Sequence, residues 1–342
     1  MTEPKVAIAT TTIHVPKVLE LLHAHDRDVA IFVAGDLKTP EPQCADFVNK
    51  LGGNAYYLSV ERQKSLKYAC SDPIGWNCIQ RRNIATLEAL KWGADIVIHH
   101  DDDNVPMNES YFDDFVSVLH HPFNGLRAIS TGEWFDPGAL LIPQVPHRGI
   151  PHEVTGTSHV QHVVGAKVGV AAGLCLGDPD IHAVTRMCAH PAVFSVNELG
   201  TAGVVVDPSI KTVFNSQNTA FIRELAPAMC MLPNLGRYDD IFASLICRRV
   251  MRDRNLHVHF GRPYAWQSRN PHNLMADLKA EMFGMEHIVR FADLLDGTNN
   301  LGITLMDHVS SIAQELIRAD WFPANAAHAL IAWTDDIETV MK

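Results

Sequence analysis

Short apolar runs alternate with helically spaced apolar positions along the first third of the chain. The runs predict strands at residues 6–9, 29–34, 55–58 and 94–98. Helices are expected between them, the first after Pro16 and the last over residues 77–92, where Gly93 ends the apolar spacing. Because strands that alternate with helices usually pair in parallel, this pattern predicts an α/β fold with a mostly parallel sheet covered by helices.

The remaining sequence is less regular in the middle and helical at the end. Short strands are expected at residues 128–131 and 139–142, a Pro/His/Gly-rich loop at 143–156, and a tightly packed strand or crossover at 163–175. Apolar spacing then predicts helices over residues 274–295, 303–317 and 326–341. With no internal repeat or low-complexity linker, we predict one catalytic domain over residues 1–295 and a helical C-terminal extension over residues 296–342.

Three consecutive carboxylates, Asp101, Asp102 and Asp103, follow the fourth predicted strand. Like charges this close repel one another, and a bound cation or open solvent relieves the repulsion. Open α/β sheets bind ligands at the carboxyl ends of their strands, so acids here suit a divalent metal that meets a diphosphate on its other side. The alternative is an exposed, solvated acidic turn. The apolar strand in front of the three acids favours the metal site.

A second acidic pair, Asp239 and Asp240, opens a predicted helix and follows Arg237. Acids at a helix N-terminus are stabilised by the helix dipole, so one interpretation is simple capping. Acids beside an arginine also suit a site that binds sugar hydroxyls and moves protons. Trp266 likewise has two interpretations, a core residue or an apolar platform for a sugar ring.

Composition narrows the classes of function. The formal net charge is −11 and Lys and Arg form no long cluster, so no binding of nucleic acid is expected. The start of the chain lacks a signal-peptide pattern, and no apolar run reaches the roughly 18–20 residues that span a bilayer. Seven scattered cysteines without a CxxC spacing indicate reduced thiols in a cytoplasmic protein. No GxGxxG fingerprint supports a flavin or nicotinamide fold.

Several short segments together resemble one known family. They are DDD at 101–103, RGIP at 148–151, DPD at 178–180, NTAF at 218–221 with RE at 223–224, GRYDD at 236–240, PYAW at 263–266, and NL at 273–274 with Lys279. In this order they resemble the reversibly glycosylated polypeptides of plants, the UDP-arabinopyranose mutase family, over most of the chain to about residue 295. One segment alone is a weak signal, whereas the ordered set is specific.

The resemblance implies a glycosyltransferase-A-like fold, in which helices flank a Rossmann-like mixed sheet. It implies Mn²⁺ or Mg²⁺ at the DDD segment, and conversion of a nucleotide-linked pyranose to its furanose without flavin or NAD. Arg148, in the RGxP segment, is implied to become reversibly glycosylated. A bacterial branch of the family, linked to furanose sugars in nucleoside antibiotics, adds GDP-galactose-type donors to UDP-arabinose-type donors. Because the family's proteins associate with one another, a homo-oligomer is expected.

We therefore expect a nucleotide-sugar site assembled from these segments. Its catalytic residues are Arg148, Asp239 and Asp240; its metal ligands are Asp101, Asp103 and His272; and its substrate-binding residues are Asp36, Arg82, Asp102, Asp180, Asn218, Arg237, Trp266 and Lys279. The chain departs from the plant proteins at Thr155, where they have a second arginine, and at Gln267, where they have a histidine. That histidine is a candidate metal ligand, so His272 is the candidate that replaces it. Beyond residue 295 no match is found.

In the expected reaction, the cation neutralises the diphosphate as the anomeric C–O bond breaks, and Arg148 holds the sugar either covalently or as an electrostatic clamp. Covalent attack requires the guanidinium, whose pKa exceeds about 12, to lose a proton. Asp239 or Asp240 shuttles protons while the smaller ring closes. Two other classes of function stay open. One is a glycosyltransferase that uses the same donor and metal, and the other is a non-catalytic partner subunit that binds nucleotide-sugar without turnover.

Overall fold

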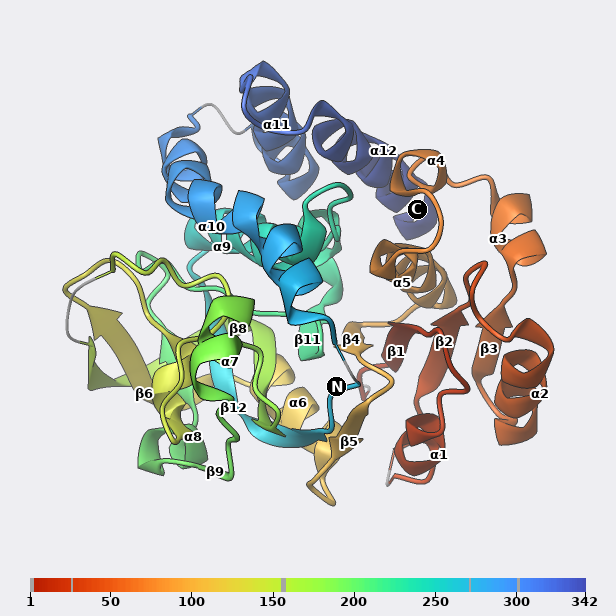
Figure 1. Ribbon diagram of the computed structural model, residues 1–342, viewed down its shortest axis with the longest axis horizontal. Coiled ribbons are helices and arrows are strands. Elements are labelled where there is room, and N and C mark those ends of the chain that lie inside the picture. Colours follow the sequence, from red (N-terminus) through yellow and green to blue (C-terminus); the bar gives the residue numbers. More distant parts are fainter. Residues whose placement is uncertain (1–2, 26, 155–157, 271, 300–301) are drawn as a thin grey trace.

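The computed structural model describes residues 3–25, 27–154, 158–270, 272–299 and 302–342. Among these residues, a 10-stranded sheet runs through the molecule in the order β3-β2-β1-β4-β11-β8-β6-β10-β12-β5. Helices pack around the sheet, and the C-terminal helices gather along the upper side of Figure 1. The chain therefore has the expected glycosyltransferase-A-like α/β fold, with a mixed sheet flanked by helices and a helical C-terminal region.

Four parallel strands form one half of the sheet. They are β1 (Val6–Thr11), β2 (Ala30–Ala34), β3 (Ala55–Leu58) and β4 (Ile96–His100). The helical segments between them are α1 (Val18–His23), α2 (Glu41–Leu51), α3 (Val60–Leu66), α4 (Ser71–Ile74), η1 (Ile79–Arg81) and α5 (Arg82–Trp92). The strands and helices predicted for this part are confirmed. Gly93 ends α5 with a left-handed φ of 98°.

Both faces of β1, β2 and β4 are buried, whereas the edge strand β3 is partly exposed. Ala7 and Ala9 of β1 belong to the core that includes α5, whereas Val6 and Ile8 belong to a second core with α1 and α6 (Tyr111–His120). Because side chains alternate along a strand, one continuous apolar run fills two cores at once. This packing fixes the carboxyl ends of the strands, and with them the acidic residues that follow β4.

Strand direction changes beyond β4. β11 (Asn218–Ile222) runs antiparallel to β4, and β8 (Ser158–Gly177) runs antiparallel to β11. The other strands of the sheet are β5 (Asn104–Pro106), β6 (Phe123–Ser130), β10 (Val204–Val206) and β12 (Leu256–Gln267). The parallel arrangement predicted from the first third of the chain therefore holds for the first four strands, and the strands beyond β4 make the whole sheet mixed, as expected. An apolar pattern indicates that a strand is buried, not which way its neighbour runs.

The middle of the chain differs in detail from its prediction. The strand expected at 139–142 is a short helical turn, η2 (Pro137–Leu140), followed by β7 (Leu141–Ile142), which pairs with β9 (Ser195–Val196). The segment 163–175 lies within β8, and residues 143–154 form the predicted loop. The helical segments of this part are α7 (Ala183–Ala189), α8 (Glu198–Ala202), η3 (Arg223–Ala228) and η4 (Gly236–Tyr238).

The C-terminal helices confirm the helical prediction. They are α10 (Leu274–Gly297), α11 (Leu305–Arg318) and α12 (Ala324–Met341). The first two pack beside α9 (Asp239–Arg252), and α12 packs against α11 and α5. Trp333 of α12 is fully buried, and its indole nitrogen donates to the carbonyl oxygens of Ala226 and Pro227 at 3.1 Å each. The extension thus shares the main hydrophobic core, while the domain boundary at residue 295 stays a prediction.

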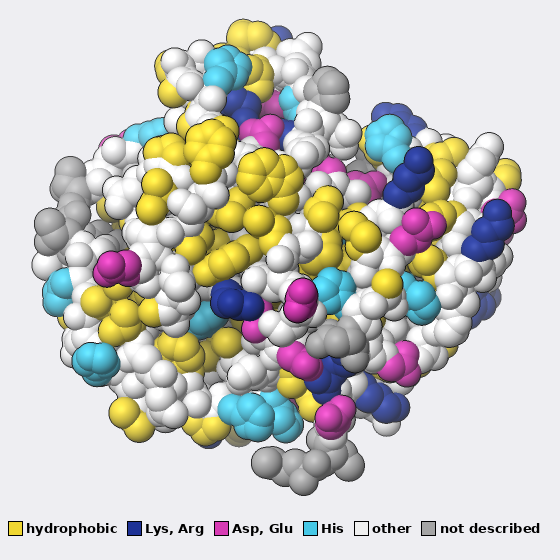
Figure 2. Space-filling view, turned by 90° about the horizontal axis from the view of Figure 1, so that it is seen from below, with side chains coloured by type: hydrophobic (Ala, Val, Ile, Leu, Met, Phe, Trp, Pro, Cys, Tyr) yellow, Lys and Arg dark blue, Asp and Glu magenta, His cyan; other side chains and the backbone are white. Residues whose placement is uncertain are grey.

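None of the helices in the described ranges is both long and apolar enough to cross a membrane. On the face seen in Figure 2, Lys and Arg side chains lie singly or in small groups among acidic and histidine side chains. The expectation that the chain binds no nucleic acid stays a prediction.

Candidate functional site

Two cavities meet at the acidic end of β4. The first, here called the Asp36 cavity, has a volume of about 340 Å³ and lies beside the ends of β1, β2 and β4. The second, the Arg148 cavity, has a volume of about 220 Å³ and lies beside the start of α9. Asp101, Asp103 and Ile79 line both cavities. A ligand with two parts therefore has room on each side of the acidic segment.

The three acids at the junction have different environments. Asp101 forms a buried ion pair with Arg82, and Asp102 accepts a hydrogen bond from the hydroxyl of Thr12. Oδ1 of Asp103 is buried and has no hydrogen-bond partner among the described residues. Burial, followed by the charges of Asp101 and Asp102, raises the pKa of Asp103 to about 6. These partly buried, coupled acids are not a simple solvated turn.

The acids at the junction fit a divalent cation, although the described residues contain no group of three His, Cys, Asp or Glu side chains arranged to hold one. Magnesium in nucleotide sites is commonly held by one or two carboxylates, with phosphate and water oxygens completing its shell. Asp101 and Asp103 can supply those carboxylates, and a cation would relieve the unpaired, repelled oxygen of Asp103. Asp101 and Asp103 as ligands stay a prediction that this environment favours.

The proposed third ligand lies nearby but is already paired. His272 lines the Arg148 cavity, and its Nδ1 lies 3.0 Å from Oδ2 of Asp277. Gln267, which stands in place of the plant histidine, lines the same cavity and lies close enough to Asp103 to lower the pKa of that carboxyl group. Its Oε1 is buried without a partner among the described residues. Of the two residues, Gln267 is therefore the one that lies beside Asp103. The role of His272 as a metal ligand stays a prediction.

The Asp36 cavity is organised by hydrogen bonds to the backbone. The carboxylate of Asp36 accepts from the amides of Leu37 at 2.7 Å, Asn77 at 2.8 Å and Cys78 at 2.9 Å. It therefore ties the loop after β2 to the segment before α5. Asp36 lines the cavity as predicted, but its oxygens are occupied by the protein, so it shapes the wall more than it offers free acceptors.

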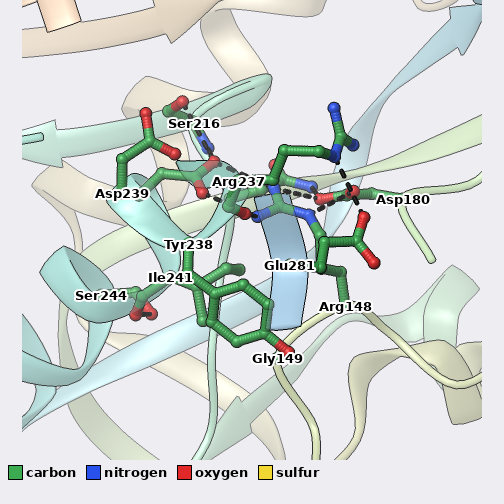
Figure 3. A network of polar contacts seen from close by, with 12 residues as sticks. Arg148, Gly149, Asp180, Ser216, Arg237, Tyr238, Asp239, Ile241, Ser244 and Glu281 are labelled. Atoms are coloured by element: carbon green, nitrogen blue, oxygen red, sulfur yellow. Dashed lines mark hydrogen bonds and ion pairs between the residues drawn. The ribbon is translucent and has the colours of Figure 1, made fainter. Parts of the chain in front are cut away.

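Arg148 is the centre of a buried ionic cluster (Figure 3). Its Nε and Nη2 donate to the two carboxylate oxygens of Asp180 at 2.8 and 2.9 Å. Its Nη1 donates to Asp240 at 3.1 Å and to the carbonyl oxygen of Arg237. The residue is only 4% exposed, so nearly all of its hydrogen-bonding capacity is used inside the protein.

This cluster sets the charges of its members. Burial alone would lower the pKa of Arg148, but Asp180 and Asp240 raise it well above its usual value. Burial alone would raise the pKa of Asp180, but Arg148 and His147 lower it well below its usual range. The guanidinium is thus held in its protonated form. Of the two roles left open for Arg148, this environment favours the electrostatic clamp over covalent capture.

The acidic pair at the start of α9 does more than cap the helix. Tyr238 occupies the N-cap position without a side-chain capping bond. Asp240 accepts from Arg148 and from the amide of Ser216 at 3.0 Å, and Asp239 accepts from Nε2 of Gln80 at 2.9 Å. Burial, followed by the charge of Asp240, raises the pKa of Asp239 to about 7. A carboxyl group in this range can give and take protons at neutral pH.

The other predicted substrate residues are only partly brought together. Arg237 lines the Arg148 cavity and donates to Glu281 at 3.0 Å, and Arg82 lines the Asp36 cavity. Asn218 is buried in contacts with Tyr111 and Pro263, and Lys279 is exposed on α10; neither is among the described residues that line the two cavities.

Trp266 lies in a third depression, here called the Trp266 groove, with a volume of about 420 Å³. Its side chain is 36% exposed, so it is not a core residue. Gln267 and Arg269 line both the groove and the Arg148 cavity, which makes the two neighbours. Thr155, the other departure from the plant sequences, lies outside the described residues.

Some site residues were not predicted from the sequence. Gln80, Ser216 and Arg269 carry no motif or spacing that marks them. Gln80 comes from the short turn before α5 and reaches an acid 159 positions further along the chain. Only the fold brings these segments together, although Arg269 follows directly on the segment that contains Trp266 and Gln267.

Comparison with known proteins gives one significant match. No protein-family model matches the chain. A segment of 186 residues is 31% identical to UDP-arabinopyranose mutase 1 of rice, Oryza sativa subsp. japonica, and covers 50% of this chain and 50% of the rice protein. The chain thus spans about half the length of the curated relative it matches. The similarity is to the family that the sequence motifs resemble, and the bacterial branch stays a prediction.

Proposed function

We propose that this protein is a metal-dependent, flavin-independent mutase that interconverts the pyranose and furanose forms of a nucleotide-sugar. The observation that carries the proposal is the pair of cavities that share Asp101 and Asp103. One cavity would take the nucleoside and the other the sugar, with the diphosphate at the shared acids. The similarity to a rice UDP-arabinopyranose mutase supports the same reaction class. The donor would be of the UDP-arabinose or GDP-galactose type.

In this proposal the residues have separate tasks. Asp101 and Asp103 would hold Mn²⁺ or Mg²⁺, which neutralises the negative charge that grows on a departing diphosphate. Isomerisation requires the hydroxyl that closes the five-membered ring to lose a proton, the former ring oxygen to gain one, and the retained diphosphate to re-form its bond to the anomeric carbon. Asp239, whose pKa is raised to about 7, would accept the first proton and return the second, while Gln80 orients its carboxylate.

Arg148 would act by position and charge. It holds Asp180 and Asp240 in one buried cluster and places a permanent positive charge beside the sugar cavity. Asp180 and Asp240 compensate that charge, so Arg148 acts by fixing the positions of the two carboxylates beside the cavity and not by offering a free positive charge to the substrate. Formation of a glycosyl–arginine bond would need a neutral guanidine, which the two carboxylates oppose. We therefore propose that Arg148 is an electrostatic clamp.

The test is a screen of UDP- and GDP-sugars with Mn²⁺ or Mg²⁺, with products separated by chromatography and identified by mass. A mutase forms a new nucleotide-sugar of unchanged mass. A variant with Asp103→Asn should form none, whereas Asp335→Asn, a change at an exposed acid of α12, should behave as the wild type. Binding of nucleotide-sugar without any product would instead support the non-catalytic partner subunit.

A glycosyltransferase is the second candidate, and the Trp266 groove favours it. The groove adjoins the sugar cavity at Gln267 and Arg269, so an acceptor would have room beside the donor. The products separate the two functions. A transferase without acceptor releases nucleoside diphosphate and free sugar slowly, whereas a mutase keeps the sugar attached to its nucleotide.

A further inference from the structure

Arg269 is a buried arginine in the wall between the Arg148 cavity and the Trp266 groove. Its side chain is 7% exposed. Its Nε and Nη1 are buried and have no hydrogen-bond partner among the described residues. The nearest carboxylate oxygen, Oδ2 of Asp277, lies 3.9 Å from Nη2, which is too far for a hydrogen bond. Two of the three guanidinium nitrogens are thus buried without a hydrogen-bond partner among the described residues, and the ion pair that the third makes with Asp277 is long.

This state sets Arg269 apart from the other arginines that line the cavities and the groove. Each of those others donates to a carboxylate: Arg82 to Asp101, Arg148 to Asp180, Arg186 to Asp178 and Arg237 to Glu281. Arg269 is the exception within the described residues, although it lines two of these depressions. Its positive charge is therefore the one among these arginines that is best placed to pair with a ligand.

Physical chemistry limits the kinds of partner. A buried charge is costly unless it is paired, and guanidinium groups pair best with phosphate and carboxylate oxygens. Burial and the charges of Arg237 and Arg186 lower the pKa of Arg269, although each of these two arginines is itself paired with a carboxylate. The cavity that Arg269 lines is also lined by Asp101 and Asp103, which suit a divalent cation. A multiply charged anion placed between Arg269 and a cation at the two acids would pair with both positive charges.

We propose that Arg269 binds the diphosphate of the nucleotide-sugar, opposite the acids that hold the cation. This proposal rests on the function proposed above, because it assigns that substrate's diphosphate to the junction of the two cavities. Arg269 lines both the cavity and the groove, so rotation about its side-chain bonds presents its donors to the ligand. Binding then supplies the hydrogen bonds that the protein itself does not.

The test compares wild type with Arg269→Met, which keeps an unbranched side chain but removes the guanidinium and its charge. The dissociation constants of UDP, UMP, GDP and inorganic diphosphate are measured by calorimetry with Mg²⁺ present. Loss of a charged hydrogen bond should weaken the two nucleoside diphosphates and inorganic diphosphate by about tenfold to 100-fold, and UMP less. Arg269→Lys, which keeps the charge, should recover part of the loss.

A matched control is Arg262→Met in the same strand region. Arg262 is about half exposed, pairs with Asp114 at the surface and is not among the residues that line the cavities. Its substitution should leave all four dissociation constants unchanged. Thermal unfolding separates a binding role from a structural one. Arg269→Met should keep or raise the melting temperature, because it removes an unpaired buried charge.

Several outcomes would overturn the proposal. One is equal affinity of wild type and Arg269→Met for nucleoside diphosphates, and another is failure of the wild type to bind them at all. A third, seen when a nucleotide-sugar that carries a carboxylate on its sugar is added to the ligands, is a loss confined to that ligand, which would assign Arg269 to the sugar instead. If binding of nucleoside diphosphates depends on Arg269 but no nucleotide-sugar isomer forms, the proposed mutase function is wrong. The assignment of Arg269 to the diphosphate is then still supported.

Discussion

The two cavities on either side of Asp101 and Asp103 are built on different principles. In the Asp36 cavity, the central carboxylate is satisfied by backbone amides of the loops that form the wall. In the Arg148 cavity, charged side chains meet one another. Two guanidinium nitrogens of Arg269 and one oxygen of the shared Asp103 have no hydrogen-bond partner within the described ranges. The hydrogen-bonding groups at the centre of the Asp36 cavity are therefore already satisfied by the protein. Polar atoms of the Arg148 cavity still lack partners, which a bound ligand would supply.

This difference suggests a division of labour. Asp103 and Asp239, whose pKa values are raised to about 6 and about 7, line the Arg148 cavity, and only Asp103 also lines the Asp36 cavity. Shifted pKa values gather where charges are used for chemistry, and rigid backbone-bonded walls are suited to recognition. We therefore expect substitutions on the Arg148 side to lower kcat, and substitutions on the Asp36 side to act mainly on KM.

The largest effect is expected for Asp103→Asn. Removal of this carboxylate takes away a cation ligand at the junction, so turnover should fall by about 100-fold or more. Chelation of divalent cations should do the same to the wild type. Because burial raises the pKa of Asp103 to about 6, its charged form disfavours folding above that pH. The melting temperature at pH 7.5 should therefore stay the same or rise, as measured by calorimetry; a marked fall would indicate a structural role.

Arg148→Lys should lose most activity and also stability. The change leaves Asp180 and Asp240 with incomplete partners, and breaking a buried pair typically costs about 3–5 kcal/mol. Denaturant unfolding measures this loss, and Arg318→Lys, at an exposed ion pair of α11, is the matched control. The intact mass of the wild type after reaction with donor and metal should show no added sugar. A hexosyl or pentosyl adduct that disappears in Arg148→Ala would contradict the clamp.

Asp239→Asn should change the pH dependence of both activity and stability. With a pKa raised to about 7, the carboxyl group binds its proton more tightly in the folded than in the unfolded chain. Its contribution to stability is therefore present at low pH and is lost as the pH rises from about 4 to about 7. The variant should lack this loss and the ionisation near pH 7 in its kcat profile, with kcat down about tenfold to 100-fold. An unchanged profile would remove Asp239 as the proton carrier.

The smallest effect is expected for Asp36→Asn. One carboxylate oxygen is replaced by a donor that cannot accept from a backbone amide, so the loop should loosen at a cost of about 1–3 kcal/mol. KM should rise several-fold while kcat stays nearly constant. Steady-state kinetics check this split. A fall in kcat as large as that of Asp239→Asn would show that the two cavities do not have separate roles.

Much of the frame of the site follows from local sequence. The acids at 101–103 were placed at a strand end because an apolar run precedes them, and Asp239 was placed at the start of a helix for the same kind of reason. Such patterns depend only on residues that are close in sequence, so they predict the ends of strands and helices without knowledge of the tertiary contacts.

Other parts depend on contacts between distant segments. Arg148 meets Asp180 and Asp240, which lie 32 and 92 positions away, and no spacing predicts that pairing. The unpaired state of Arg269 is likewise a property of the folded wall. The apolar pattern also does not predict that β11 pairs antiparallel with β4, because a buried strand has the same pattern in either direction.

The central claim is that the Arg148 cavity isomerises a nucleotide-bound sugar. Its most direct test is to start two reactions, one from the pyranose and one from the furanose form of the nucleotide-sugar that the screen identifies, each with Mn²⁺ or Mg²⁺, and to follow both by chromatography. The account predicts that both reactions reach the same ratio of two nucleotide-sugars of equal mass. Ratios that stay where they began, or release of nucleoside diphosphate and free sugar as the only change, would contradict it.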